Sequence, residues 1–228
     1  MLSIKDLSFS YNEELVLKEI NISFKTQTIH GIVGLNGSGK TTFFNLLSGF
    51  LTPDNGTILL NDTEILKKDI AYIDAESFFY PKLTASEFLA VFPKTNSNFN
   101  EQELTHIFNL PLDEFIENYS TGMKKKLLIL SQLKQDKQLF IFDEPFNGLD
   151  IESNKSLQYI IELLNKKGKT IFIASHIIEP LFGLCHQIHH LKNKNFVKSY
   201  LPNDYSVLNM EVFEEFDERL KNTLSKSL

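Results

Sequence analysis

The stretch Gly34–Thr42, which reads GLNGSGKTT, constrains the fold of this chain more than any other part of the sequence. It contains the pattern G-x-x-x-x-G-K-T, typical of a loop that wraps around phosphate groups, the P-loop. Glycines let the backbone turn its N–H groups inward as an anion-sized nest, and the following helix adds its positive N-terminal end. In such a loop, Lys40 supplies a positive charge for the outer phosphates, and the Thr41 hydroxyl is placed to hold Mg²⁺. We expect phosphate contacts from Gly34, Leu35, Asn36, Gly37, Ser38, Gly39, Lys40, Thr41 and Thr42.

The residues on either side of the loop fit this interpretation better than a chance glycine turn does. Thr28–Val33 is β-branched and apolar, as expected of a buried strand that leads into the loop. Thr41–Ser48 has the pattern of a helix that leads out of it, and Gly49 follows as a stop signal. A strand, a P-loop and a helix in this order indicate a phosphate-binding core.

Composition excludes several classes of protein. The 228 residues suffice for one large domain, or for a domain with a subdomain. The net charge of −6 argues against a surface that coats nucleic acid. A single cysteine, Cys185, excludes an intrachain disulfide framework, suits a reducing compartment and is expected to be a small buried residue. We expect no signal peptide, and no window approaches the ~20 apolar residues of a membrane span.

Strand patterns dominate the two ends of the chain, and helical patterns dominate its middle. We expect strands at 2–9, 20–24, 28–33, 57–60, 70–73, 138–143, 170–174, 188–191 and 196–200, the last two at a sheet edge. We expect helices at 41–48, 83–92, 100–110, 111–117, 122–133, 157–164 and 208–224. The pattern predicts an α/β fold: a P-loop NTPase core with a mixed, largely parallel sheet, an N-terminal antiparallel β subdomain and an inserted α-helical subdomain.

We expect these elements to form a single domain over residues 1–228. The nucleotide-binding core is predicted at 1–75 and 134–205, the helical subdomain at 76–133 and a C-terminal helix at 206–228. Inside the subdomain, Thr84 is a predicted N-cap with Glu87 three residues later, which is the spacing of a capping box.

A second chemical motif, Asp143-Glu144, follows the apolar run Leu139–Phe142. On its own, this pair ahead of Pro145 indicates a turn at the end of a strand. With a P-loop upstream, it fits the Walker B arrangement, in which Asp143 reaches Mg²⁺ through water. Glu144 would then orient or deprotonate the attacking water. We therefore expect Glu144 to be the catalytic base.

The order of the motifs resembles that in the ATP-binding subunits of ABC transporters, over roughly residues 2 to 200. The motifs are Tyr11, the P-loop, Tyr119-Ser120-Thr121-Gly122-Met123, Asp143-Glu144, Gly148-Leu149-Asp150, and His176 after Ala174-Ser175. Ser120-Thr121-Gly122 stands where the family signature Leu-Ser-Gly-Gly-Gln stands, ahead of a basic helix. Thr121 and Met123 replace Gly and Gln, and the Met form occurs in the branch that resembles drug, lipid or polysaccharide exporters.

The resemblance implies a site shared between two subunits. Tyr11 would stack on the adenine of ATP, although capping of the sheet edge is the simpler interpretation of that residue alone. Ser120 and Gly122 would bind the γ-phosphate of ATP held by a second subunit, and Asp150 would contact that subunit.

The resemblance also completes the predicted catalytic set. His176 would hydrogen-bond the γ-phosphate and sense its loss, acting with Glu144 and Lys40. The implied cofactors are ATP and Mg²⁺, with the metal held by Thr41 and Asp143. The other histidines show no metal-ligand spacing that we consider significant.

The sequence departs from the family at one position. Transporter ATPases usually carry a glutamine at the end of the strand that enters the helical subdomain, and Ala75 stands there. Glu76 is one residue further on, so it either substitutes as a metal contact or points into solvent. We favour the second alternative, which weakens the expected coupling between the γ-phosphate and the subdomain.

Two apolar features remain open to more than one interpretation. The adjacent aromatics Phe78, Phe79 and Tyr80 either fill the subdomain core or line a groove for a membrane partner. Apolar residues at helical spacing within Leu208–Leu224 are expected to dock that helix on its own domain.

We predict a motor subunit that dimerises on ATP, with itself or with a related ATPase subunit, and drives a separate membrane permease, in an exporter. It would lie in the cytoplasm on the inner face of the cell membrane, bound through the permease. The alternatives are a soluble ABC-type ATPase that acts on ribosomes or DNA, and a nucleotide-dependent regulator with weak turnover. The acidic charge, a single ATPase domain and the short insert argue against the first alternative, and no nucleic-acid partner is expected.

Overall fold

The computed structural model describes residues 1–75 and 78–227, and its chain divides into two compact units. The first, which we call the terminal unit, combines Met1–Ile65 with Phe172–Leu228. The second, the central unit, is Leu66–Ile171. The P-loop thus belongs to the terminal unit, and the motifs around Ser120 and Asp143 belong to the central unit. The finer boundaries predicted for the helical subdomain stay a prediction.

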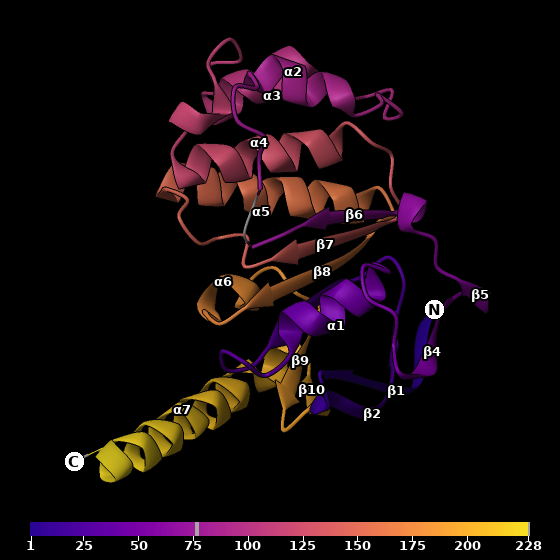
Figure 1. The fold of residues 1–228 in the computed structure, drawn as a ribbon, viewed down its shortest axis with the longest axis vertical. Coiled ribbons are helices and arrows are strands. Elements are labelled where there is room, and N and C mark those ends of the chain that lie inside the picture. The colour runs from indigo at the N-terminus through magenta and orange to yellow at the C-terminus, as the bar shows by residue number, and fades with distance from the viewer. Residues whose placement is uncertain (76–77, 228) are drawn as a thin grey trace. The chain divides into compact units, whose positions relative to one another are not determined.

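A four-stranded antiparallel sheet confirms the N-terminal β subdomain (Figure 1). In the order β2-β1-β4-β5, its strands are β2 (Glu14–Phe24), β1 (Leu2–Tyr11), β4 (Asn55–Leu60) and β5 (Thr63–Glu64). β2 begins earlier than predicted because Asn12 and Glu13, with φ of 44° and 72°, form a two-residue hairpin turn. Asn61 and Asp62 form a similar turn before β5, a strand that the sequence did not predict.

The second sheet is mixed and largely parallel, as predicted. In the terminal unit its strands follow the order β10-β9-β3-β8: β10 (Asn195–Tyr200), β9 (Gln187–Lys192), β3 (Ile29–Val33) and β8 (Thr170–Ser175), whose last four residues belong to this unit. β9 runs parallel to β3, with His30 opposite Gln187, and antiparallel to β10. The prediction that β9 lies at an edge is wrong, because its four central residues are buried between β3 and β10.

Helices α1 (Lys40–Leu47), α6 (Glu179–Phe182) and α7 (Tyr205–Ser227) complete the terminal unit. The core beneath α1 is aromatic, which reflects a sequence with 20 phenylalanines and no tryptophan. The Phe24 ring lies 4.9 Å from Phe172, and the Phe43 ring lies 5.0 Å from Phe196, both edge to face. Because Phe43 sits in the first turn of α1, this packing holds the end of the P-loop against the sheet.

α7 departs from its predicted packing. Tyr205 and Leu208 are buried, but Phe213 is 72% exposed and Phe216 is 52% exposed. The apolar residues within Leu208–Leu224 were expected to dock this helix on its own domain, and beyond Leu208 they do so only in part. Polar contacts hold the exposed portion instead, including Glu215 at 3.0 Å from His190. None of the helices in the described ranges is both long enough and apolar enough to span a membrane.

The central unit joins a short parallel sheet to a set of helices. Strand β6 (Ile70–Ile73) pairs in parallel with β7 (Leu139–Asp143). The helices are α2 (Ala85–Val91), α3 (Glu101–Phe108), α4 (Thr121–Leu133) and α5 (Ile151–Lys166). The capping box at α2 is confirmed, with Thr84 accepting from the backbone of Glu87 and the Glu87 carboxylate accepting in return. α5 begins six residues before its predicted start because Asp150 caps it.

One predicted helix is wrong. Residues 111–117 form turns, and only Ile116–Asn118 adopts a short 3₁₀ helix. The chain is held extended at Phe115, which forms a β-bridge with Thr84, and the backbone of Ile116 donates to Leu83. These long-range contacts outweigh the local helix propensity.

Candidate functional site

The P-loop joins β3 to α1, and each of its glycines meets a separate steric demand. A Cβ on Gly34 would lie 2.4 Å from the carbonyl oxygen of Leu191, so no larger residue fits there. Gly37 and Gly39 have φ of 84° and 103°, values that other residues rarely adopt. Gly39 is also the N-cap of α1, so the positive end of that helix opens into the loop.

The side chains of the loop provide positive charge and hydroxyl groups. Lys40 is 7% exposed, and its Nζ donates to the carbonyl oxygens of Gly34 at 2.9 Å and Leu35 at 3.4 Å. The ammonium group therefore lies across the loop. The Ser38 hydroxyl is buried and has no hydrogen-bond partner among the described residues, while Thr41 is exposed in the first turn of α1. A cationic, glycine-lined loop with a spare hydroxyl fits a phosphate chain.

His176, just after β8, faces the same cavity as the P-loop. The cavity has a volume of about 420 Å³, and His176, Leu35 and Asn36 all line it. Tyr11 ends β1 and is 45% exposed, with its ring edge to face with Phe9 at 4.8 Å. Tyr11 pairs with Glu14 across the hairpin at the end of β1, an inner strand of its sheet, so it does not cap a sheet edge, and its stacking on adenine stays a prediction.

Helix α7 also borders the P-loop, which sequence reasoning missed. Phe213 and Phe216 line the same cavity, and Arg219 donates to the carbonyl oxygen of Asn36 at 2.9 Å. Arg219 is the only arginine in the sequence, and that rarity was the one available signal.

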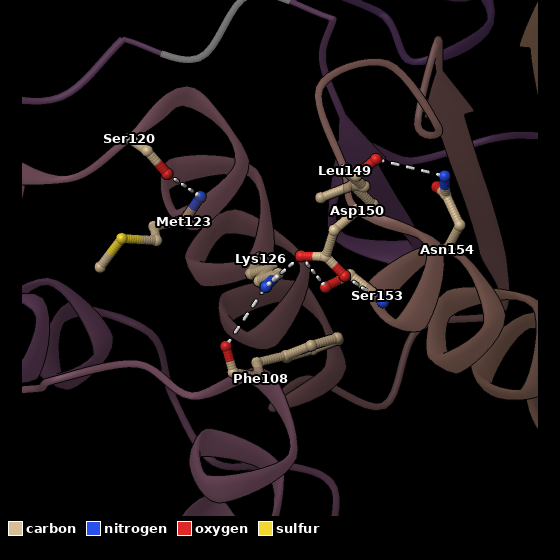
Figure 2. Close-up of polar contacts among 8 residues, drawn as sticks. All are labelled: Phe108, Ser120, Met123, Lys126, Leu149, Asp150, Ser153 and Asn154. Carbon is tan, nitrogen blue, oxygen red and sulfur yellow. Dashed lines mark hydrogen bonds and ion pairs between the residues drawn. The ribbon is translucent and has the colours of Figure 1, made fainter.

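In the central unit, the Ser120–Gly122 segment forms the start of α4. Ser120 is the N-cap, and its hydroxyl accepts from the backbone N–H of Met123 at 3.2 Å (Figure 2). A Cβ on Gly122 would lie 2.6 Å from the carbonyl oxygen of Gly148, so this first turn packs closely against the loop that precedes Asp150.

Asp150 is the N-cap of α5 and lies beside α4. Its carboxylate accepts from the backbone N–H of Ser153 at 2.8 Å and from the Ser153 hydroxyl at 2.9 Å. These bonds, together with Lys126 at 3.4 Å, lower the pKa of Asp150 to about 2. Figure 2 shows Lys126 between Asp150 and the carbonyl oxygen of Phe108, a bridge that the sequence did not reveal.

The Asp143-Glu144 pair stands at the end of β7. Asp143 is fully buried, and Glu144 is half-buried with a φ of 48°, a left-handed value unusual for glutamate. Asn147 approaches the Glu144 carboxylate at 3.5 Å, and Lys125 of α4 donates to the Glu144 carbonyl oxygen at 2.6 Å. The structure thus links the Asp143-Glu144 pair to α4, whose N-cap is Ser120.

Comparison with known proteins settles the family. A family model described as ABC transporter matches residues 17–147, more than half of the chain. The chain belongs to the ABC transporter family. Within that family, it is an ATP-binding subunit that hydrolyses ATP.

Individual ABC proteins are similar to this chain over most of its length. The lantibiotic transport ATP-binding protein SrtF of Streptococcus pyogenes is 31% identical over 189 residues, which cover 79% of this chain and 82% of that protein. A solved ATP-binding subunit of an ABC transporter is 26% identical with a TM-score of 0.81, covering 97% of this chain and 99% of that chain. The dimeric ATP-binding cassette MJ0796, solved with ADP and Pi, shares the fold at 21% identity and a TM-score of 0.76. The match covers 89% of this chain and 99% of that chain.

Ala75, which we expect at the position of the usual ABC glutamine, is half-buried, and Glu76 lies outside the described residues. Of the two interpretations of the adjacent aromatics, packing in the subdomain core holds for one residue, and a groove for a membrane partner stays a prediction. Phe79 packs against Phe88 at 5.0 Å, whereas Phe78 and Tyr80 are 80% and 72% exposed. They line a cleft of about 310 Å³ with Phe79, Pro81, Glu117 and Lys124.

Proposed function

We propose that this chain is the motor subunit of an ABC exporter, which hydrolyses ATP as a dimer and drives a separate membrane permease. The observation that carries the proposal is the P-loop, where a buried lysine, three sterically required glycines and a helix N-terminus converge. Gly34–Thr42 would hold the phosphates, and Tyr11 would stack on adenine.

Thr41 and Asp143 would supply oxygen atoms for Mg²⁺. Thr41 is an exposed residue in the first turn of α1, and Asp143 is the last residue of β7. Hydroxyl and carboxylate oxygens are the hard donors that Mg²⁺ prefers, alongside phosphate and water. The metal would neutralise part of the negative charge on the phosphates.

Hydrolysis needs a base for water and a donor for the γ-phosphate. Glu144 follows Asp143 directly and would orient and deprotonate the attacking water. His176, which shares a cavity with Asn36, would donate a hydrogen bond to the γ-phosphate oxygens. Lys40 would stabilise the charge that remains on the phosphates. Ala75 provides none of the metal contact that a glutamine would provide, so γ-phosphate sensing would rest on His176.

Dimerisation would complete the site. The Ser120 hydroxyl and the N-terminal turn at Gly122 form an anion-binding helix end, which would meet the γ-phosphate held by the opposite subunit. Asp150 lies beside that turn and would contact the opposite subunit. The dimeric state of the similar MJ0796 cassette supports this arrangement. The partner subunit would be a second copy or a related ATPase.

The membrane permease would dock on the exposed aromatics. Phe78 and Tyr80 form an apolar patch beside Lys124, and aromatic side chains are favoured at the centres of protein interfaces. Export is supported by the similarity to SrtF, a lantibiotic transport protein. The chain would therefore lie on the inner face of the cell membrane, held by the permease.

Membrane association in cells tests this proposal. The tagged wild-type chain should sediment with membranes only when its permease is expressed. The double variant Phe78→Ala, Tyr80→Ala should stay in the supernatant while keeping ATP binding. Tyr159→Ala, a 54% exposed aromatic on α5, is the matched control and should sediment like the wild type. Sedimentation with ribosomes instead of membranes would favour the alternative function in translation.

A further inference from the structure

Lys125 is a buried lysine near the start of α4, five residues after Ser120. Only 4% of its surface is exposed, and a lysine is seldom buried so deeply unless its ammonium group has partners. Here Nζ donates to the carbonyl oxygen of Glu144 at 2.6 Å and to that of Asn147 at 3.2 Å. Two backbone carbonyls of the loop after β7 are therefore held by one side chain from α4.

The Glu144 backbone needs such a constraint. Its φ of 48° lies in the left-handed region, which costs free energy for any residue with a Cβ. The backbone hydrogen bonds within the loop are long. They measure 3.4 Å from the Asn147 nitrogen to the Glu144 oxygen, and 3.5 Å from the Leu149 nitrogen to the Phe146 oxygen. Burial lowers the pKa of Lys125, and the nearby Glu144 and Asp143 carboxylates oppose that lowering, so they help to keep the buried ammonium group charged.

We propose that Lys125 is a positioning residue for ATP hydrolysis, which fixes the Glu144 backbone so that the Glu144 carboxylate meets the attacking water. The inference rests on the proposed role of Glu144 as the base. Because Ser120 and Lys125 belong to one helix, the direction of the catalytic carboxylate is tied to the helix end that would bind the other subunit's ATP. A rotation of α4 would thus move both groups together.

Steady-state ATPase kinetics of the full-length chain test the inference. Lys125→Met keeps the length and packing of the side chain but removes the donor. We expect kcat to fall at least about tenfold, while KM for ATP changes less than about threefold, because misplacement of the base affects chemistry more than binding. Lys125→Arg keeps a charged donor and should recover part of kcat. Lys94→Met, an exposed lysine in the same unit, is the charge-matched control and should behave like the wild type.

A double variant separates positioning from simple loss of stability. In a Glu144→Gln background, Lys125→Met should cause no further loss of kcat, because both changes disable the same group. An additional loss of tenfold there, or wild-type kcat in Lys125→Met alone while Glu144→Gln is inactive, overturns the inference and leaves the proposed function intact. If Glu144→Gln itself hydrolyses ATP at the wild-type rate, the base assignment and the inference both fail.

Discussion

The Cβ position of Gly122 lies 2.6 Å from the carbonyl oxygen of Gly148, closer than any real Cβ approaches. The first turn of α4 therefore rests directly on the loop before α5, and only glycine permits this. A Gly→Ala change inside a helix normally stabilises it by up to ~1 kcal/mol. At Gly122, however, the added methyl group must displace backbone.

We predict that Gly122→Ala lowers the free energy of unfolding by roughly 1–3 kcal/mol, the usual cost of overpacking. Urea denaturation followed by circular dichroism measures this value. Gly183→Ala is the matched control, because a Cβ there meets nothing within 4 Å. Equal stability of the two variants would show that the Gly122 contact is unimportant.

Ser120→Asp tests the split site more cleanly than Gly122→Asp, whose side chain would meet Gly148 of its own chain. Aspartate is a good N-cap, so α4 should keep its start. The added carboxylate should repel the opposite subunit's γ-phosphate. We predict unchanged ATP affinity in the monomer, with loss of ATP-dependent dimerisation and of turnover, measured by calorimetry, light scattering and phosphate release. Asn100→Asp, at the N-cap of α3, should have no effect. Weaker ATP binding by the monomer would count against the split site.

Lys40→Ala should weaken ATP binding by about 10- to 100-fold, since a charge-assisted hydrogen bond contributes roughly 1.5–3 kcal/mol. Removal of the ammonium also frees the carbonyl oxygens of Gly34 and Leu35, which it now contacts. Equilibrium titration with a fluorescent ATP analogue measures the change. Lys25→Ala removes an exposed lysine next to the same sheet and serves as the control. Equal affinity in the two variants would contradict the phosphate role of Lys40.

Two buried histidines should make the stability of the protein depend on pH. Burial lowers the pKa of His30 to about 4, and burial together with the facing His30 lowers that of His189 to about 3. The two rings share a hydrogen bond of 3.1 Å. His30 also contacts the Lys25 carbonyl oxygen, and His189 also contacts the Ser199 hydroxyl. Between pH 6.5 and 4, the unfolded chain binds protons that the folded chain does not. Folding stability should therefore decrease as the pH falls, by about 1.4 kcal/mol per pH unit for each histidine.

Urea denaturation at pH 7.5, 6 and 5 checks this prediction. The double variant His30→Phe, His189→Phe lacks both titrations, so its unfolding free energy should change less with pH than that of the wild type. His106→Gln, an exposed histidine on α3, should keep the wild-type dependence. An unchanged slope in the double variant would exclude these histidines as the source.

Much of the fold was predictable from local patterns. Thr28–Val33 and Thr41–Ser48 mark the strand and helix around the P-loop, and the Thr84–Glu87 spacing specifies a cap within one turn of chain. Residues 111–117 were mispredicted because a bridge between Thr84 and Phe115 overrides their local preference.

The contacts of the site were less predictable than its motifs. Lys125 and Lys126 are adjacent in a run of three lysines, and nothing in that run shows that one is buried against Glu144 while the other meets Asp150. Likewise, the apolar stripe of α7 gives no sign that Arg219 reaches Asn36. Such contacts depend on how elements distant in sequence pack, so they require the structure.

The behaviour of Glu144→Gln with ATP tests the central claim most directly. The substitution keeps the shape of the side chain but removes the base, so ATP should bind and persist. With Mg²⁺ and ATP, size-exclusion chromatography with light scattering should show a stable dimer that retains unhydrolysed ATP, whereas the wild type returns to monomer as ADP accumulates. A Glu144→Gln variant that hydrolyses ATP at the wild-type rate, or that binds ATP without forming a dimer, would contradict the account.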